Sequence, residues 1–165
     1  MTARRLNIIR CVAISGALMG LARGEMPADA SVIVEGAWIP LAPLAMKVHA
    51  AYMTVINRSA ADIFIVGADS PDYERIELHR STLRDGVSSM EAVDAVGVPV
   101  NGRVEFAPTG VHFMLLGSKR PQVLDNRVPI VLRLSSGDKV EVSAIVRRRN
   151  DPMGVAPGRN EHGPH

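Results

Sequence analysis

The sequence contains few of the residues on which most metal sites and nucleic-acid-binding surfaces depend. Its 165 residues include one cysteine and only 4% aromatic residues. A single cysteine excludes an internal disulfide framework, a Cys-x-x-Cys redox pair and a thiolate zinc site. What is present, 47% hydrophobic and 22% charged residues, argues against a wholly disordered chain and fits one folded domain.

The first thirty residues have the organisation of an export signal. Three arginines lie within the first ten residues, and an uncharged, mostly apolar stretch follows over residues 11–22. That stretch has the length of a signal-peptide core and is too short to span a bilayer. We therefore expect residues 1–30 to be a cleaved signal peptide, cut after Gly24 or Ala30, rather than a buried helix or a short anchor. The mature protein would lie in the periplasm without a stable membrane span.

Removal of this segment changes the charge of the protein. The whole chain has a formal net charge of +2. Residues 1–30 hold four basic and two acidic residues, so the remainder is formally neutral, and a cut after Gly24 would leave a charge of −2. The mature domain thus lacks the basic surface typical of nucleic-acid-binding proteins, and no such partner is expected. Cys11 is lost with the signal. Because Arg10 precedes it and no apolar run comes before it, it is not a convincing lipidation site.

From residue 31 onward, short β-like runs alternate with turn residues, and no long segment has helical periodicity. The nine strands that this pattern predicts cover Ser31–Ile39, His49–Ile56, Asp62–Val66, Tyr73–Leu78, Val87–Val96, Arg103–Phe106, Val111–Leu116, Pro129–Leu134 and Lys139–Val146. Strands of this length and spacing predict one all-β domain over residues 31–146, a sandwich or barrel with Greek-key connections. Residues 147–165 lack apolar periodicity and are expected to form a flexible, disordered tail.

Without cysteine, a metal site in the mature chain must use histidine, methionine or carboxylates. His112 and Met114 would project from the same face of one predicted strand, since side chains alternate along a strand. Imidazole and thioether groups together suit a soft ion such as Cu(I). His79 lies on the charged face of another strand beside Glu77, and Met90 follows the next turn, so these two are expected to be neighbours. Taken one by one, the methionines could equally be core residues.

The order of these four residues resembles the signature of a known family. His79, ten residues, Met90, twenty-one residues, His112, one residue and Met114 match the pattern of the PCuAC periplasmic copper chaperones, and Phe106–Met114 is similar to the family's sequence there. The resemblance implies a cupredoxin-like fold and Cu(I) bound by His79, Met90, His112 and Met114. It also implies transfer of copper to the CuA domain of cytochrome c oxidase subunit II, together with a Sco-type protein. We expect the protein to be a monomer.

The chain departs from the family pattern outside these four positions. Thr109-Gly110 stands where the family often has two glycines, and Ser135-Ser136 replaces an apolar pair in the last hairpin. The C-terminal tail has fewer histidines and methionines than many family tails. Whether Met153, His162 and His165 form a second, Cu(II) site therefore stays open.

Two other classes of function compete with a copper chaperone. One is a metal-free periplasmic β-sandwich interaction module in which the histidines and methionines only fill space. The other is a small copper oxidoreductase, but a redox-cycling blue-copper site would use a cysteine thiolate, and the mature chain has none. No catalytic arrangement of serine, histidine and aspartate stands out, so we expect that the protein is not an enzyme.

The expected histidine ligands predict a pH-dependent copper affinity. Imidazole must be neutral to bind a metal, whereas a thioether does not titrate, so Cu(I) affinity should fall as the pH is lowered from about 8 to about 5. A competition titration with a Cu(I) chelator at several pH values measures this. An affinity that stays constant over that range would argue against histidine ligands.

Overall fold

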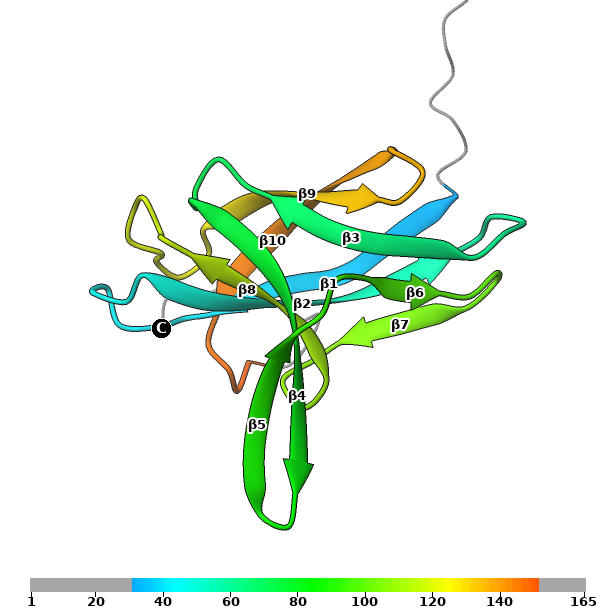
Figure 1. Ribbon diagram of the computed structural model, residues 1–165. Coiled ribbons are helices and arrows are strands. Elements are labelled where there is room, and N and C mark those ends of the chain that lie inside the picture. Colours follow the sequence, from blue (N-terminus) through cyan, green and yellow to red (C-terminus); the bar gives the residue numbers. More distant parts are fainter. Residues whose placement is uncertain (1–30, 152–165) are drawn as a thin grey trace, which may run out of the picture.

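The structure, a computed structural model, describes residues 31–151 as ten β-strands without a helix (Figure 1). The strands are β1 Val32–Pro40, β2 Val48–Asn57, β3 Ile63–Asp69, β4 Arg75–Arg84, β5 Val87–Ala92, β6 Val96–Val98, β7 Arg103–Phe106, β8 Val111–Leu116, β9 Arg127–Leu134 and β10 Lys139–Arg147. Over these residues no helix is long and apolar enough to cross a membrane. The prediction of an all-β protein is confirmed. The predicted signal peptide and residues 152–165 lie outside the described part.

Seven of the strands form a closed ring. The order β4-β8-β2-β1-β10-β9-β3 returns to β4 through a pairing between β3 and β4. All pairs in the ring are antiparallel except β1 with β10, the first and last strands of the domain. Neighbours in the ring are often far apart in sequence, as in Greek-key proteins. Closure leaves three short strands outside the ring: β5 on β4, β6 on β3 and β7 on β2.

The structure differs from the expected strands in the middle of the chain. The single strand expected over Val87–Val96 is two strands, because the chain changes partner: β5 pairs with β4, and β6 pairs with β3. Val93 N–H still donates to the Leu78 carbonyl (2.9 Å) at the crossing. In addition, β4 continues to Arg84, well beyond the expected end at Leu78. The charged residues after Leu78 obscured this extension, because both faces of the strand are exposed there.

The core lies inside the ring and follows the alternation of each strand. In β4 and β8 the inward residues are Ile76, Leu78, Phe113 and Leu115, all at most 7% exposed. Phe113 stacks on Phe106 with ring centroids 4.6 Å apart. Since inward and outward residues alternate, burial of these side chains fixes which residues of β4 and β8 face outward.

A bulge in β1 sets the orientation of the only tryptophan. The pairing with β2 shifts between Glu35 and Trp38, with Gly36 at a φ of +60°. Because of this extra residue, the side chains that follow it point to the opposite faces of the sheet. Ile39 is therefore fully buried, and Trp38 faces outward. Without the bulge, the indole would point into the core.

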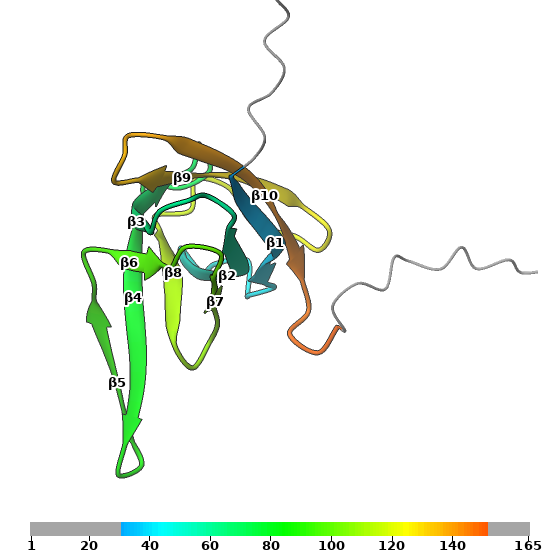
Figure 2. The same ribbon diagram turned by 90° about the vertical axis from the view of Figure 1, so that its right-hand side faces the viewer.

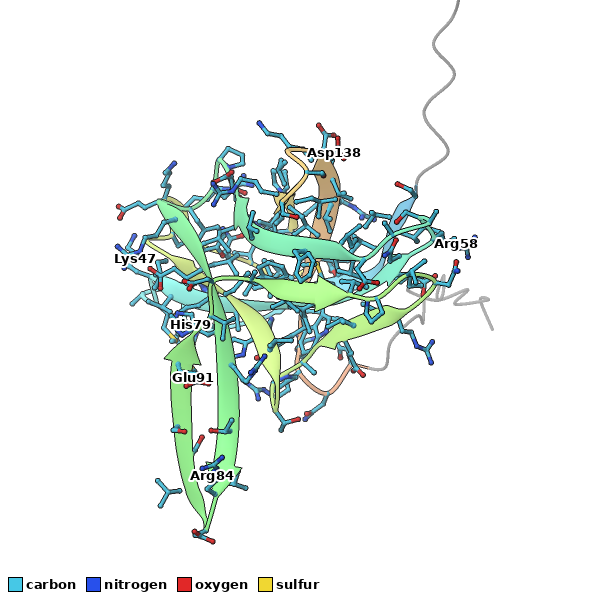
Figure 3. The ribbon with its side chains drawn as sticks, turned by 45° about the vertical axis from the view of Figure 1, so that its right-hand side comes forward. Lys47, Arg58, His79, Arg84, Glu91 and Asp138 are labelled. Carbon is cyan, nitrogen blue, oxygen red and sulfur yellow. The ribbon has the colours of Figure 1, made fainter. Side chains whose placement is uncertain are left out.

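Strands β4 and β5 extend beyond the ring as a two-stranded arm, which projects from the body in both ribbon views (Figures 1 and 2). The arm turns at Asp85-Gly86, with φ values of +50° and +78°. Two successive positive φ values suit the tight turn that connects twisted antiparallel strands, and Asp-Gly is a favoured sequence for it. Every residue of β5 is exposed. Figure 3 shows His79 at the base of the arm, Glu91 further out and Arg84 near the tip.

We predict that Phe113→Ala will lower the free energy of unfolding by about 3–5 kcal/mol, because it leaves a cavity beneath Phe106 in the core. Leu83→Ala, at an arm position that is 74% exposed, should change it by less than about 0.5 kcal/mol. Urea unfolding followed by circular dichroism measures both. Equal effects of the two substitutions would contradict the assignment of the core.

Candidate metal centre

Two histidines lie opposite each other on the outer face of the ring. His79 of β4 and His112 of β8 are paired in register, and their ring centroids are 6.3 Å apart. Both residues alternate with core residues, which turns their rings away from the interior. The side chain of His79 is only 14% exposed and His112 as a whole only 4% exposed. Neighbouring strands thus bring together two residues that are 33 positions apart in the sequence.

The two methionines flank this pair on the same face. Met114 lies two residues beyond His112 and pairs with Glu77 and Ala50. Met90 of β5 pairs with Ser81, and His79 pairs with Ala92. Met90 and His79 are therefore diagonal neighbours across the arm. The structure places all four expected ligands on one face, contributed by three adjacent strands.

A cavity of about 380 Å³ opens on this face. Its walls include Met90, His112 and Met114, together with Ser81 of β4, Tyr52 of β2 and Met46. His79 does not line it and lies beside it, next to His112. A larger hollow of about 750 Å³ between the start of β1 and β10 contains none of the four candidate ligands.

Two more residues of the types that can bind a soft metal, Met46 and His49, lie near the start of β2. Met46 lies in the loop before β2, but that loop reaches the cavity, so its thioether is a wall residue that the sequence did not reveal. His49 lies within β2, on the face that points into the core, and is 7% exposed. The core continues to this end of β2, where the ring of Tyr73 covers His49.

Each histidine of the centre has one ring nitrogen engaged in a hydrogen bond. Nε2 of His79 lies 3.0 Å from Oε2 of Glu77, and Nδ1 of His112 lies 3.1 Å from the carbonyl oxygen of Gly110. The second carboxylate oxygen of Glu77 accepts from Nε of Arg75 at 2.7 Å. The hydrogen bond from His79 lowers the pKa of Glu77, and the nearby Arg75 acts in the same direction.

The donor set is that of a soft-metal site. Over residues 31–151, no group of three or more histidine, cysteine, aspartate or glutamate side chains could hold a metal ion. The two imidazoles are joined here by two thioethers, which hard ions such as Mg²⁺ and Ca²⁺ do not favour and Cu(I) does. Nδ1 of His79 is buried and has no hydrogen-bond partner among the described residues. A buried ring nitrogen without a partner among these residues, in a ring next to that of His112, fits a site that accepts a cation.

A row of aromatic rings borders the centre on the side of β2 and β1. The ring of Tyr52 lies 6.3 Å from that of His112 and 5.0 Å from that of Trp38. The guanidinium of Arg147, the last residue of β10, lies over the indole of Trp38 at 4.2 Å. Burial raises the pKa of Tyr52 above that of a free tyrosine. The row covers the outer face beside His112.

Comparison with known proteins identifies the family. The model of the family described as "Putative lipoprotein LpqE-like" matches residues 32–146, and the chain belongs to this family. A relative from Leifsonia xyli subsp. xyli (strain CTCB07), named "Putative lipoprotein Lxx21020", is 28% identical over 152 residues, covering 86% of this chain and 90% of the relative.

Solved structures share the fold. The copper-bound PCuAC domain from PmoF2 superposes with a TM-score of 0.61 at 20% identity, over 72% of this chain and 93% of that one. CuI-DR1885 from Deinococcus radiodurans superposes with a TM-score of 0.59 at 31% identity, over 72% of this chain and 79% of that one. The resemblance to PCuAC domains and the cupredoxin-like fold are thereby confirmed.

The buried histidine outside the centre predicts an acid-labile fold. Burial lowers the pKa of His49, and burial raises the pKa of Tyr73 to about 12, so the tyrosine hydroxyl donates to a neutral Nδ1 of His49 at 3.1 Å. The unfolded chain takes up a proton at this residue below about pH 6.5, while the folded chain resists it. The stability that this group provides is therefore complete above that pH and is lost as the pH falls through the lowered value.

We predict that His49→Gln, which keeps an acceptor for Tyr73 but does not titrate, will flatten the loss of stability between about pH 7.5 and about pH 5. The measurement is urea unfolding of the copper-free protein at several pH values. If the variant shows the same decline as the unchanged protein, His49 is not the group responsible.

Proposed function

We propose that this protein is an exported copper chaperone that binds one Cu(I) ion through His79, Met90, His112 and Met114. The observation that carries the proposal is the presence of two imidazoles and two thioethers on one face of three adjacent strands, beside a cavity. The copper-bound PCuAC domain of PmoF2 and CuI-DR1885 share the fold, which supports copper as the cargo.

Neutral donors suit an ion that has to be released. Two thioethers and two neutral imidazoles leave the charge of Cu(I) unchanged and favour the reduced, soft ion. A thiolate site would hold copper more tightly, but a thiol is prone to oxidation outside the cytoplasm. The only cysteine, Cys11, lies within the predicted signal peptide. The site therefore uses ligands that cannot form disulfides in an oxidising compartment.

The exposure of the ligands supports transfer. His79 and His112 are largely buried in the wall of the ring, whereas Met90 is 52% exposed on the arm. An incoming ligand of a recipient protein can reach the ion from the side of Met90 without disturbing the core. Copper would leave by replacement of this thioether first and of the better protected imidazoles last.

The family resemblance supports a proposal for the recipient and the compartment. We propose the CuA domain of cytochrome c oxidase subunit II as recipient, with a Sco-type protein as co-worker, and no nucleic-acid partner. The family description and the Leifsonia relative both carry the word lipoprotein, which supports an exported protein. Within the exported class we propose a periplasmic, monomeric protein released by cleavage of residues 1–30.

Two alternatives are separated from this proposal by simple observations. A metal-free interaction module would bind no Cu(I) when titrated. A copper oxidoreductase would turn over superoxide or peroxide when loaded, which we do not expect in the absence of a thiolate ligand.

We predict that the double variant His112→Ala, Met114→Ala will lose the single Cu(I) equivalent in a titration against a competing chelator, because it removes one imidazole and one thioether from the same strand. Trp38 provides a second readout, since its ring contacts Tyr52, which lies beside His112. A stoichiometry unchanged in the double variant would refute the proposed site.

Met90→Leu tests the arm separately. The substitution keeps the apolar volume and removes the sulfur, so we expect weaker Cu(I) binding without a change in fold. Leu83→Ala on the same arm is the matched control and should bind as the unchanged protein does.

Transfer to an apo CuA domain, followed by its absorption spectrum, then shows whether bound copper is delivered.

A further inference from the structure

The two histidines of the centre differ in which ring nitrogen is free. The hydrogen bond to the Glu77 carboxylate uses Nε2 of His79, and a carboxylate can only accept, so Nε2 carries the proton. The lone pair of a neutral ring must then lie on Nδ1, the atom that is buried without a partner among residues 31–151. In His112 the proton and the lone pair lie on the opposite nitrogens. Its Nδ1 donates to the carbonyl of Gly110, and its Nε2 keeps the lone pair.

This difference follows from the strand geometry. Glu77 and His79 are separated by one residue on β4, so their side chains lie on the same face and can bond each other. Gly110 lies two residues before His112, at the turn that precedes β8, and its carbonyl oxygen accepts both from the backbone N–H of Ser81 (3.0 Å) and from the ring of His112 (3.1 Å). Each histidine is therefore held in one tautomer by a neighbour two positions earlier in the sequence.

We infer that Glu77 is a positioning residue of the copper centre: it holds His79 so that Nδ1 binds the ion, while His112 binds through Nε2. The inference rests on the proposed function. Glu77 lies opposite Met114 in register and is not one of the four proposed ligands. Partners that fix the tautomer of a metal-binding histidine commonly contribute about 10- to 100-fold to metal affinity.

Both oxygens of the Glu77 carboxylate are already engaged, one by His79 and one by Arg75 at 2.7 Å. Arg75 thus holds the carboxylate while the carboxylate holds the imidazole. The side chain of Glu77 is 38% exposed, so the bonds to it compete with water. Their effect lies in orientation of the ring rather than in stability of the fold.

The first experiment observes the ring nitrogens directly. Long-range ¹H–¹⁵N correlation spectra of the copper-free protein should show His79 protonated on Nε2 and His112 protonated on Nδ1. Addition of Cu(I) should then shift Nδ1 of His79 and Nε2 of His112. A shift of Nε2 of His79 on copper binding would overturn the assignment, while the proposed function would stand. If neither ring responds and no copper binds, both fail.

The second experiment removes the carboxylate. We expect Glu77→Ala to weaken Cu(I) binding by about tenfold and to give mixed tautomers of His79 in the copper-free protein, with the amide spectrum otherwise unchanged. Glu77→Gln retains an oxygen that accepts from Nε2, so it should restore much of the affinity and the single tautomer.

Glu91→Ala is the matched control. Glu91 lies on the adjacent strand of the same arm, opposite Arg80, and its removal takes away the same charge without a bond to either histidine. An affinity within about twofold of the unchanged protein is expected for it. If Glu91→Ala weakens binding as much as Glu77→Ala does, the effect is one of overall charge and the positioning role is refuted. A single His79 tautomer that persists in Glu77→Ala would refute it as well.

Discussion

The register between β4 and β8 is the constraint on which the centre depends. In this pairing His79 is opposite His112 and Glu77 is opposite Met114. The register is fixed from the other side of the sheet, where the alternating residues of both strands are buried in the core. A slip of one residue would turn these apolar side chains outward and the ligands inward. The free energy of core burial therefore maintains the geometry of a site that has little stability of its own.

The centre combines a rigid half and an accessible half. The histidines belong to strands that are part of the closed ring, and they pair with each other in register. Met90 belongs to β5, which pairs only with β4 and is exposed along its whole length. Strands with few buried contacts are the parts of a protein that open most readily. A site built across this boundary can keep its specificity in the ring while it exchanges ligands at the arm.

Much of this was accessible from the sequence, and what was missed has a physical cause. Alternation alone placed His112 and Met114 on one outward face, and Asp85-Gly86 marked the turn that brings Met90 back towards His79. The length of the arm was not predictable, since a strand exposed on both faces shows no apolar alternation. The burial of His49 was not predictable, because it depends on Tyr73, a contact between distant segments. Met46 reaches the cavity only through the path of its loop, which no local pattern encodes.

The carboxylate beside the ligands bears on which metals the centre admits. A free carboxylate next to two imidazoles would form a site for zinc or Cu(II), which favour nitrogen and oxygen donors. Here each oxygen of Glu77 already accepts a hydrogen bond, one from Arg75 and one from His79, so binding of an ion to either oxygen would compete with these bonds. The donors of the proposed site are two imidazole nitrogens and two thioether sulfurs. The same hydrogen bonds that orient His79 therefore also disfavour ions that need an oxygen donor and favour a soft ion.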